Sequence, residues 1–276
     1  MEAVGMEGRA GTLARGLSLL SAFDEECSEM NLAELARAAD LPKPTVLRLL
    51  RTLEEFGFVS RNSGLYRVGY RCLMLGTLYE LDSDVRRRAL PTMRSLMERV
   101  GEVVQLGVMR DSQVLYLERV QPRRSVAVAS VLTRPGVLRE AHCTALGKAM
   151  LAYGLEGEKG HGLGTVELVP RTEATITSRE DFLAALEVVR GCGYATDTGE
   201  CDPEVNCVAA PVFGEGDQVV AALSISAPSF RMPAGVQAEL GELVKGAARE
   251  ISHGFHQGES RDEDGGREMV ENNKDG

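Results

Sequence analysis

One segment near the N-terminus constrains the fold more than any other, because its residues follow the order helix, turn, helix and hairpin. Asn31 is a favourable N-cap for a helix over residues 32–39, and Glu34 stands three residues further on, at the spacing of a capping box. After a short turn, Pro42 and Pro44 suit the first turn of a second helix, where a missing N–H group costs little. This order predicts a winged helix-turn-helix.

The second helix of this motif is amphipathic. Its apolar face carries hydrophobic residues at the spacing i, i+3, i+4 and i+7, namely Val46, Leu49, Leu50 and Leu53. Its opposite face is polar and basic, with Lys43, Thr45, Arg48, Arg51 and Thr52. Gly57 should end the helix, and residues 58–68 read as two short strands around an Asn-Ser-Gly turn. The motif then spans residues 31–68.

The charge distribution favours double-stranded DNA as the partner of this motif. The whole chain has a formal net charge of −10, yet residues 41–71 hold six basic residues against two acidic ones. Lysine and arginine are required to displace the counterions that surround phosphates. An ordinary helix with a solvated basic face is the alternative, and the order of the elements argues against it. The residues expected to contact DNA are Lys43, Thr45, Arg48 and Arg51 on the second helix, with Arg61 and Arg67 on the wing.

Length and composition limit the remaining possibilities. At 276 residues, the chain has room for about two domains, and its 43% hydrophobic content can fill their cores. No apolar stretch approaches the length that spans a membrane, so we expect a soluble, cytoplasmic protein without a membrane partner. The six cysteines contain no CxxC pair, which favours reduced thiols and gives no reason to expect a metal or another cofactor.

Periodicity along the chain predicts an α+β architecture. An apolar stripe before the motif should supply its third helix, with Leu13, Leu17, Leu20 and Phe23. Further helices are expected over residues 70–81, 84–100, 146–155, 178–190 and 235–255. Strands are expected over residues 103–109, 113–120, 126–132, 205–213 and 218–226. This order describes an antiparallel sheet covered by helices, in the manner of a GAF or PAS sensor domain.

The predicted domain boundaries follow from these elements. A winged helix-turn-helix domain is expected over residues 10–69, a linker helix over 70–82 and an effector-binding domain over 83–256. Residues 257–276 are rich in glycine and charge and should form a disordered tail.

The whole arrangement resembles the IclR family of bacterial transcription regulators. The matching segments cover residues 32–36, 41–50, 101–104, 142–149, 193–195, 209–213 and 223–228. The resemblance implies a regulator, not an enzyme, that binds a small organic ligand in its C-terminal domain. It also implies dimerisation through the N-terminal domain, with many members assembling into tetramers. We expect a homodimer on a pseudo-palindromic operator, because one helix-turn-helix reads only a few base pairs. The shared surfaces should be the apolar face of residues 70–81 and the stripe at Leu13, Leu17 and Leu20.

An effector pocket is expected between a helix start and a strand face. Backbone N–H groups of residues 144–147 at the helix start can face an anion, and Ser224 and Ser226 point to the same side of their strand. The resemblance adds Asp197 and two apolar wall positions. The expected pocket residues are Val128, Val131, Ala145, Leu146, Asp197, Cys207, Ser224 and Ser226. The alternative is that both serines are packed hydroxyls bonded to nearby backbone. Residues 198–204 depart from the family pattern, so the identity of the effector cannot be inferred from that of any family member.

Three cysteines permit a different function. Cys192, Cys201 and Cys207 could serve a thiol-based redox sensor or a GAF-type enzyme similar to a methionine-sulfoxide reductase. A reactive thiol needs electropositive neighbours, whereas residues 197–204 contain four acidic ones. No residue is therefore proposed as catalytic, and the regulator is the favoured reading.

Overall fold

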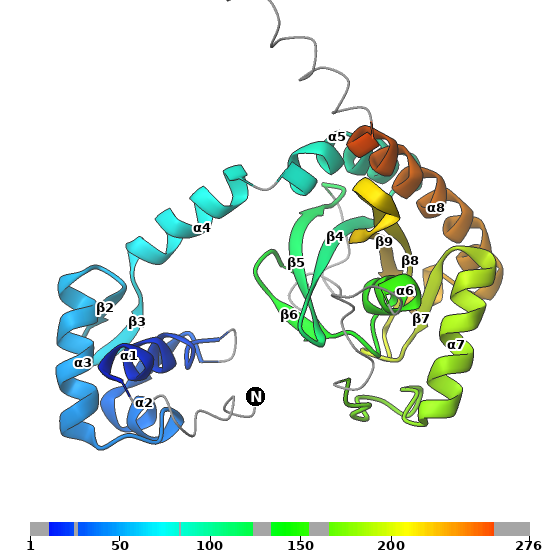
Figure 1. Cartoon of the computed structure of the whole chain (residues 1–276). Helices are drawn as coiled ribbons and strands as arrows, with labels where there is room; N and C mark the ends of the chain where they lie inside the picture. The colour runs from blue at the N-terminus through cyan, green and yellow to red at the C-terminus, as the bar shows by residue number, and fades with distance from the viewer. Residues whose placement is uncertain (1–10, 25–26, 83, 124–133, 155–165, 257–276) are drawn as a thin grey trace, which may run out of the picture. The chain divides into compact units, whose positions relative to one another are not determined.

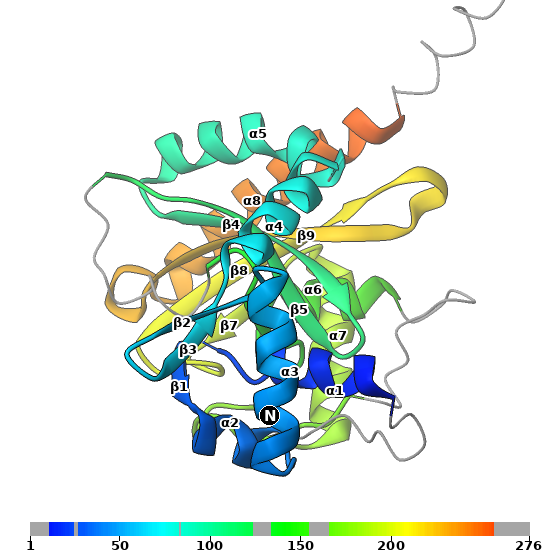
Figure 2. The ribbon, with the colours of Figure 1, turned by 90° about the vertical axis from the view of Figure 1, so that its left-hand side faces the viewer.

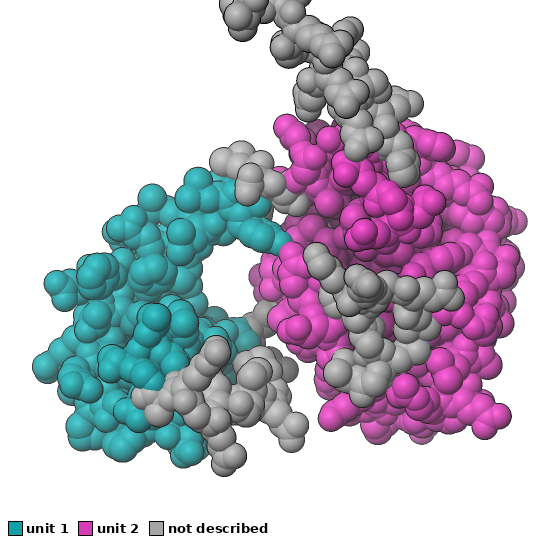
Figure 3. Space-filling model, in the orientation of Figure 1, with its two compact units in different colours: residues 1–82 teal, residues 83–276 magenta. Residues whose placement is uncertain are grey.

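The structure is a computed structural model of the whole chain, and it describes residues 11–24, 27–82, 84–123, 134–154 and 166–256. The chain divides into two compact units, Met1–Asp82 and Ser83–Gly276, which Figure 3 colours separately. The predicted strand over residues 126–132 and the predicted tail over 257–276 lie outside the described residues, as do the expected pocket residues Val128 and Val131.

The first unit is a winged helix-turn-helix, as predicted (Figures 1 and 2). Its helices are α1 (Thr12–Leu20), α2 (Leu32–Ala38), α3 (Lys43–Glu55) and α4 (Tyr70–Asp82). Its strands are β1 (Glu29–Asn31), β2 (Val59–Asn62) and β3 (Leu65–Val68). They form an antiparallel sheet in the order β1-β3-β2, so the wing has a third strand that the sequence pattern did not predict.

Local capping fixes the turn between α2 and α3. The predicted capping box is confirmed: the Asn31 side chain accepts hydrogen bonds from the N–H groups of Ala33 and Glu34 at 2.8 and 3.1 Å. The Glu34 carboxylate accepts the Asn31 N–H at 2.8 Å. After α2, Asp40 takes a positive φ of 50°, and the Leu41 N–H reaches the Ala36 carbonyl at 3.0 Å. These are the features of a Schellman C-cap, which reverses the chain within a few residues.

The end of α3 uses the same device. Gly57 adopts a φ of 76°, a conformation that suits glycine because it has no Cβ atom. The Phe58 N–H then donates to the Leu53 carbonyl at 2.8 Å. The prediction that Gly57 ends the helix is confirmed, and the chain passes directly from α3 into the wing.

The core of the first unit differs from the expected apolar stripe in one respect. Val46, Leu49 and Leu50 of α3 are buried as predicted. On α1, however, the fully buried side chain is Leu19, while Leu13 and Leu17 are 76% and 54% exposed. Leu13 and Leu17, which the sequence analysis assigns to the shared surface of a dimer, are therefore uncovered in the single chain. Helix α1 packs against α3 through the face that carries Leu19, so the side chains of Leu13 and Leu17 stay exposed.

The second unit is an antiparallel six-stranded sheet with helices on both faces. Its strands are β4 (Val103–Arg110), β5 (Gln113–Val120), β6 (Leu138–Glu140), β7 (Ala195–Thr198), β8 (Val205–Phe213) and β9 (Val219–Pro228), in the order β6-β5-β4-β9-β8-β7. Its helices are α5 (Asp84–Val100), α6 (Ala145–Tyr153), α7 (Arg179–Cys192) and α8 (Ala234–His256). Short 3₁₀ turns, η4 (Glu215–Asp217) and η5 (Ser229–Arg231), flank β9. The α+β expectation is confirmed.

Two apolar clusters hold this unit together. One lies between the sheet and the pair α5 and α8, and includes Met93, Leu223 and Val244. The other lies between the opposite face of the sheet and the pair α6 and α7, and includes Leu146 and Phe182. Figure 1 shows α5 and α8 side by side, with α6 across the sheet from them. Strands β6 and β7 escaped prediction because each is very short and sits at a sheet edge.

Candidate functional site

The exposed face of α3 presents a basic surface made of Lys43, Arg48 and Arg51. All three side chains are exposed, while Thr45 is half-buried. The apolar face of the same helix is held in the core, so the basic side chains have a fixed direction. A helix of this kind, presented by a capped turn, has the dimensions to enter the major groove of DNA.

The side chains of the two wing arginines, Arg61 and Arg67, are both held by contacts within the first unit. The guanidinium of Arg61 stacks over the ring of Tyr66, with its central carbon 5.3 Å from the ring centroid. Arg67 forms an ion pair with Glu29 of β1 at 3.3 Å, and both side chains are 44% exposed. An ion pair this exposed contributes little and can be exchanged for a phosphate contact. Glu29 nevertheless offsets part of the charge of Arg67.

On the sheet face toward α6, a polar row crosses four adjacent strands. The polar row consists of Gln105 on β4, Ser224 and Ser226 on β9, Cys207 on β8 and Asp197 on β7. Strand register explains the row: Gln105 lies opposite Ser224, Ser226 opposite Cys207, and Cys207 opposite Asp197. Five polar side chains therefore meet on a surface otherwise lined by the apolar cluster that contains Leu146.

Gln105 connects the two serines, and sequence reasoning missed it. The Ser226 hydroxyl donates to Gln105 Oε1 at 2.9 Å and the Ser224 hydroxyl does so at 3.5 Å. The Cys207 sulfur lies 3.1 Å from the Ser226 hydroxyl oxygen. Both serines thus bond a neighbouring side chain rather than the nearby backbone. The signal that could have found Gln105 is a glutamine within a strand of otherwise apolar residues.

Asp197 is the charged end of the polar row. It is 3% exposed, and its Oδ1 accepts the Glu200 N–H at 2.7 Å. Burial raises the pKa of Asp197 to about 7, and the Lys148 ammonium opposes this rise. A carboxyl group with such a pKa can be protonated near neutral pH and then donates a hydrogen bond.

The start of α6 has fewer free donors than expected. Thr144 caps the helix, and its hydroxyl oxygen accepts the Gly147 N–H at 3.1 Å. Ala145 and Leu146 are buried in the apolar cluster on the same face of the sheet as the polar row. Gly147 touches the preceding segment so closely that a Cβ atom would lie 2.1 Å from the Ala141 carbonyl oxygen.

Lys148 and Glu200 form an ion pair inside the second unit. Their side chains are 4% and 9% exposed, and the ammonium contacts Oε1 of the carboxylate. Among the described residues, the other oxygen, Oε2, has no hydrogen-bond partner. The Thr175 hydroxyl fixes the same segment by donating to the Glu200 carbonyl at 2.7 Å. Sequence reasoning left Lys148 out because a lysine in a helix is normally exposed.

The cysteines do not form the group that the redox alternative required. The Cys192 thiol donates to the Tyr194 carbonyl at 3.0 Å, and Cys207 belongs to the polar row. All six cysteines are free thiols, and the Cys143 sulfur lies 3.7 Å from the Glu140 carbonyl oxygen. Within the described ranges, no three His, Cys, Asp or Glu side chains gather so as to hold a metal ion.

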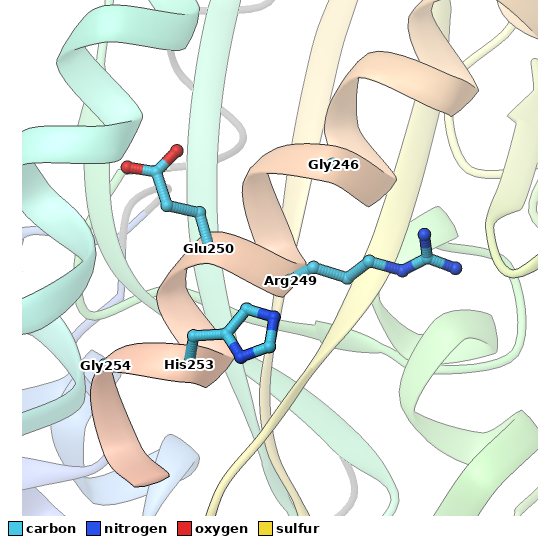
Figure 4. A pocket seen from close by; sticks show the side chains of 5 residues that line it. All are labelled: Gly246, Arg249, Glu250, His253 and Gly254. Carbon is cyan, nitrogen blue, oxygen red and sulfur yellow. The ribbon is translucent and has the colours of Figure 1, made fainter. Parts of the chain in front are cut away.

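A groove along α8, next to α5, is a separate feature (Figure 4). It is lined by Gly246, Arg249, Glu250, His253 and Gly254. Figure 4 shows Arg249 and Glu250 pointing to opposite sides of the helix. Glu250 accepts a hydrogen bond from Thr92 of α5 at 3.0 Å, and the Gly254 carbonyl accepts one from Arg88 of α5. The polar groups along this groove attach α5 to α8.

A winged helix-turn-helix unit and a separate α/β unit with a polar sheet face, in one chain, define a transcription regulator with a sensor domain. The chain belongs to the IclR family. Residues 79–253 match the family's C-terminal domain, described as bacterial transcriptional regulator IclR C-terminal, and residues 12–63 match the IclR helix-turn-helix domain.

Curated relatives and solved structures agree with this assignment. The chain is 30% identical over 243 residues to the HTH-type transcriptional regulator XynR of Escherichia coli, covering 87% of this chain and 95% of XynR. It is 32% identical over 242 residues to KdgR of the same organism, covering 86% and 90%. A solved IclR homologue of Microbacterium hydrocarbonoxydans, in complex with 4-hydroxybenzoate, has a TM-score of 0.72 at 26% identity and covers 89% of this chain and 99% of that one. No helix in the described part of the chain has the length and apolar character to cross a membrane.

Proposed function

We propose that the chain is a repressor whose α3 reads operator DNA and whose DNA binding is controlled by a small organic acid. The observation that carries the DNA-binding half is the basic surface of Lys43, Arg48 and Arg51, presented by a helix whose other face is in the core. Thr45 completes the proposed reading face. Arg61 and Arg67 are proposed as phosphate contacts, which orient the protein without reading sequence.

We infer that the regulator is a homodimer through its first unit. The face of α4 that is uncovered in the single chain carries Leu73 and Leu78, which are 75% and 61% exposed. Leu13 and Leu17 of α1 are exposed as well. Uncovered apolar patches of this kind mark protein contacts, and two copies would place two α3 helices on a pseudo-palindromic operator. Further assembly into a dimer of dimers is proposed on family resemblance alone.

The effector is proposed to bind over the polar row. Hydroxyl and amide groups on an apolar floor are the usual composition of a small-molecule site. A protonated Asp197 can donate to a ligand carboxylate, which removes the repulsion that an ionised carboxylate would cause. The homologue of known structure holds 4-hydroxybenzoate, an acid that carries both a carboxyl and a hydroxyl group. We propose Ala145, Leu146, Cys207, Ser224 and Ser226 as contacts, together with Asp197, Val128 and Val131.

These proposals describe a binding protein that works on DNA in the cytoplasm and catalyses no reaction. Its relatives are transcription regulators. A ligand controls DNA binding only if it binds the DNA-competent and DNA-incompetent states with different affinity.

The test of DNA binding begins with selection of bound duplexes from a random pool by the purified full-length chain. Arg48→Ala should then weaken binding to the selected site by about 1–3 kcal/mol, because a side chain that contacts a base edge contributes that much. Arg99→Ala, which removes an exposed arginine of α5, is the matched control and should bind like the wild type. Equal affinity of the Arg48 variant and the control would remove Arg48 from the reading surface.

The test of the effector site uses thermal unfolding with 4-hydroxybenzoate and other hydroxylated carboxylic acids. A ligand at about 100 times its Kd should stabilise the protein by roughly 2.7 kcal/mol. The double variant Ser224→Ala plus Ser226→Ala should lose this shift and keep operator binding. Ser95→Ala, at an exposed position of α5, should keep both. If the double variant retains the full shift, the ligand binds elsewhere.

A further inference from the structure

The hydrogen bonds of the polar row have a fixed direction. The Ser226 hydroxyl donates to Gln105 Oε1 at 2.9 Å, and a hydroxyl group has only one proton to give. The Cys207 sulfur lies 3.1 Å from the Ser226 hydroxyl oxygen. Because the proton of Ser226 is already used, the Cys207 thiol must be the donor in this second contact. The chain of hydrogen bonds therefore runs from Cys207 to Ser226 and from Ser226 to Gln105.

The Gln105 amide oxygen is the end point of this chain. It also accepts the Ser224 hydroxyl, at the longer distance of 3.5 Å. All three residues are buried, so bulk water does not compete for these protons. Strand register keeps them together, because Gln105 on β4 lies opposite Ser224 on β9, and Ser226 follows two positions later on the same face. One amide oxygen thus binds the hydroxyl protons of both serines.

This arrangement limits what the serines can offer to a ligand. A hydroxyl group whose proton is bound elsewhere can only accept a hydrogen bond, through its remaining lone pairs. The Cys207 thiol has likewise given its single proton to Ser226. These three groups therefore present acceptors to the space above the row. A ligand hydroxyl, amide N–H or ammonium group fits that pattern, whereas a ligand carboxylate would meet only lone pairs.

We propose that Gln105 determines the specificity of the effector site by holding Ser224 and Ser226 as acceptors, so that the effector places a hydrogen-bond donor, and not its carboxylate, against them. This inference rests on the proposed effector site and names the chemistry of one end of it. Gln105 acts through the serines and is a positioning residue. An effector with both a hydroxyl and a carboxyl group then has one orientation, with its hydroxyl toward β9 and its carboxyl group toward the Asp197 end of the row.

The first test needs no ligand. The full-length chain is isotopically labelled at the serine Cβ atoms and studied by nuclear magnetic resonance in an equal mixture of light and heavy water. A hydroxyl proton held in a buried hydrogen bond exchanges slowly, and the Cβ signal then splits into one line for each hydrogen isotope. The Ser226 signal, identified by its loss in Ser226→Ala, should be split in the wild type and merged in Gln105→Met.

A glutamine on the neighbouring strand provides the matched control. Gln113 of β5 directly precedes Val114, whose side chain belongs to the apolar cluster on the α6 side of the sheet. Successive side chains of a strand point to opposite faces, so Gln113 points away from the polar row. Gln113→Met makes the same chemical change there and should leave the Ser226 signal split.

The second test measures ligand preference by isothermal titration calorimetry. The probes are 4-hydroxybenzoate, 4-aminobenzoate, 4-fluorobenzoate and terephthalate, which share one carboxylate and differ in the group opposite it. The wild type should bind the first two at least about ten-fold more tightly than the others, because a site built to bind a hydroxyl group rejects an analogue that lacks it. Gln105→Met frees the serine protons, so the disadvantage of terephthalate should shrink by about ten-fold. Gln105→Glu keeps an acceptor at this position and should keep the wild-type order of the probes.

The outcomes separate this inference from the proposed function. The role of Gln105 is overturned if the Ser226 signal is merged in the wild type, or if it stays split in Gln105→Met. It is also overturned if the wild type binds terephthalate or 4-fluorobenzoate as tightly as 4-hydroxybenzoate. Slow exchange that depends on Gln105, with no binding of any of the four probes, would support the fixed serine protons and overturn the proposed effector class instead.

Discussion

The buried ion pair between Lys148 and Glu200 allows a sharp prediction about stability. The two side chains are 4% and 9% exposed, and the second carboxylate oxygen of Glu200 is already without a partner among the described residues. Lys148→Met keeps the aliphatic part of the side chain and removes the ammonium group. The remaining buried carboxylate would then have no compensating charge. We expect the free energy of unfolding to fall by about 3–5 kcal/mol, the usual cost of breaking a buried pair.

The assay is urea unfolding of the full-length chain, followed by far-ultraviolet circular dichroism because the sequence has no tryptophan. The double variant Lys148→Met plus Glu200→Met should be more stable than Lys148→Met alone, since well-packed apolar residues can replace a buried pair at little cost. Arg87→Met is the matched control. It breaks an ion pair with Asp84 whose side chains are 73% and 48% exposed, and it should change stability by less than about 1 kcal/mol. A loss for Lys148→Met as small as that of the control would refute the reasoning, as would a double variant less stable than Lys148→Met alone.

Three further predictions concern other parts of the chain. Because burial raises the pKa of Asp197 to about 7, the folded state holds a proton that the unfolded state has released above about pH 4, so this residue makes stability fall between about pH 4 and pH 7. Asp197→Asn lacks this loss, so urea unfolding should show the variant gaining stability relative to the wild type between about pH 4 and about pH 7. Parallel curves for the two proteins would contradict the assignment. Asn31→Ala should destabilise the first unit by about 1 kcal/mol in the same assay, since it removes both acceptor bonds of the cap. Leu73→Asp plus Leu78→Asp should yield a monomer by light scattering, and an unchanged dimer would place the contact away from α4.

The parts of the fold that the sequence predicted are those whose information is local. The capping box at Asn31, the helix end at Gly57 and the strand over residues 205–213 depend on neighbours within a few positions. A capping side chain reaches only the next three residues, so the spacing of the residues in the sequence determines whether the cap can form. These features were therefore visible before any tertiary contact was known.

The parts that escaped prediction depend on partners far along the chain. Strand β1 exists because Glu29–Asn31 pairs with β3, more than 30 positions later, and three residues have no period of their own. Gln105 matters because β9 lies next to β4. Lys148 is buried because it pairs with Glu200, which lies 52 positions later in the sequence. The burial of Leu19, which lies outside the expected stripe of α1, could not be foreseen either, since periodicity shows that a face is apolar and not what covers it.

The contact between Gly147 and Ala141 has a mechanical consequence. Ordinary van der Waals contact begins at 3.4 Å, so even alanine, with its Cβ atom 2.1 Å from the Ala141 carbonyl, would force the two backbones apart. Because Gly147 has no Cβ atom, the first turn of α6 packs directly against the backbone of Ala141, which follows β6. Because close-packed interiors transmit strain, we expect a displacement of the first turn of α6 to be passed to the segment that follows β6. The absence of a side chain at Gly147 is what makes this direct contact between α6 and the segment after β6 possible.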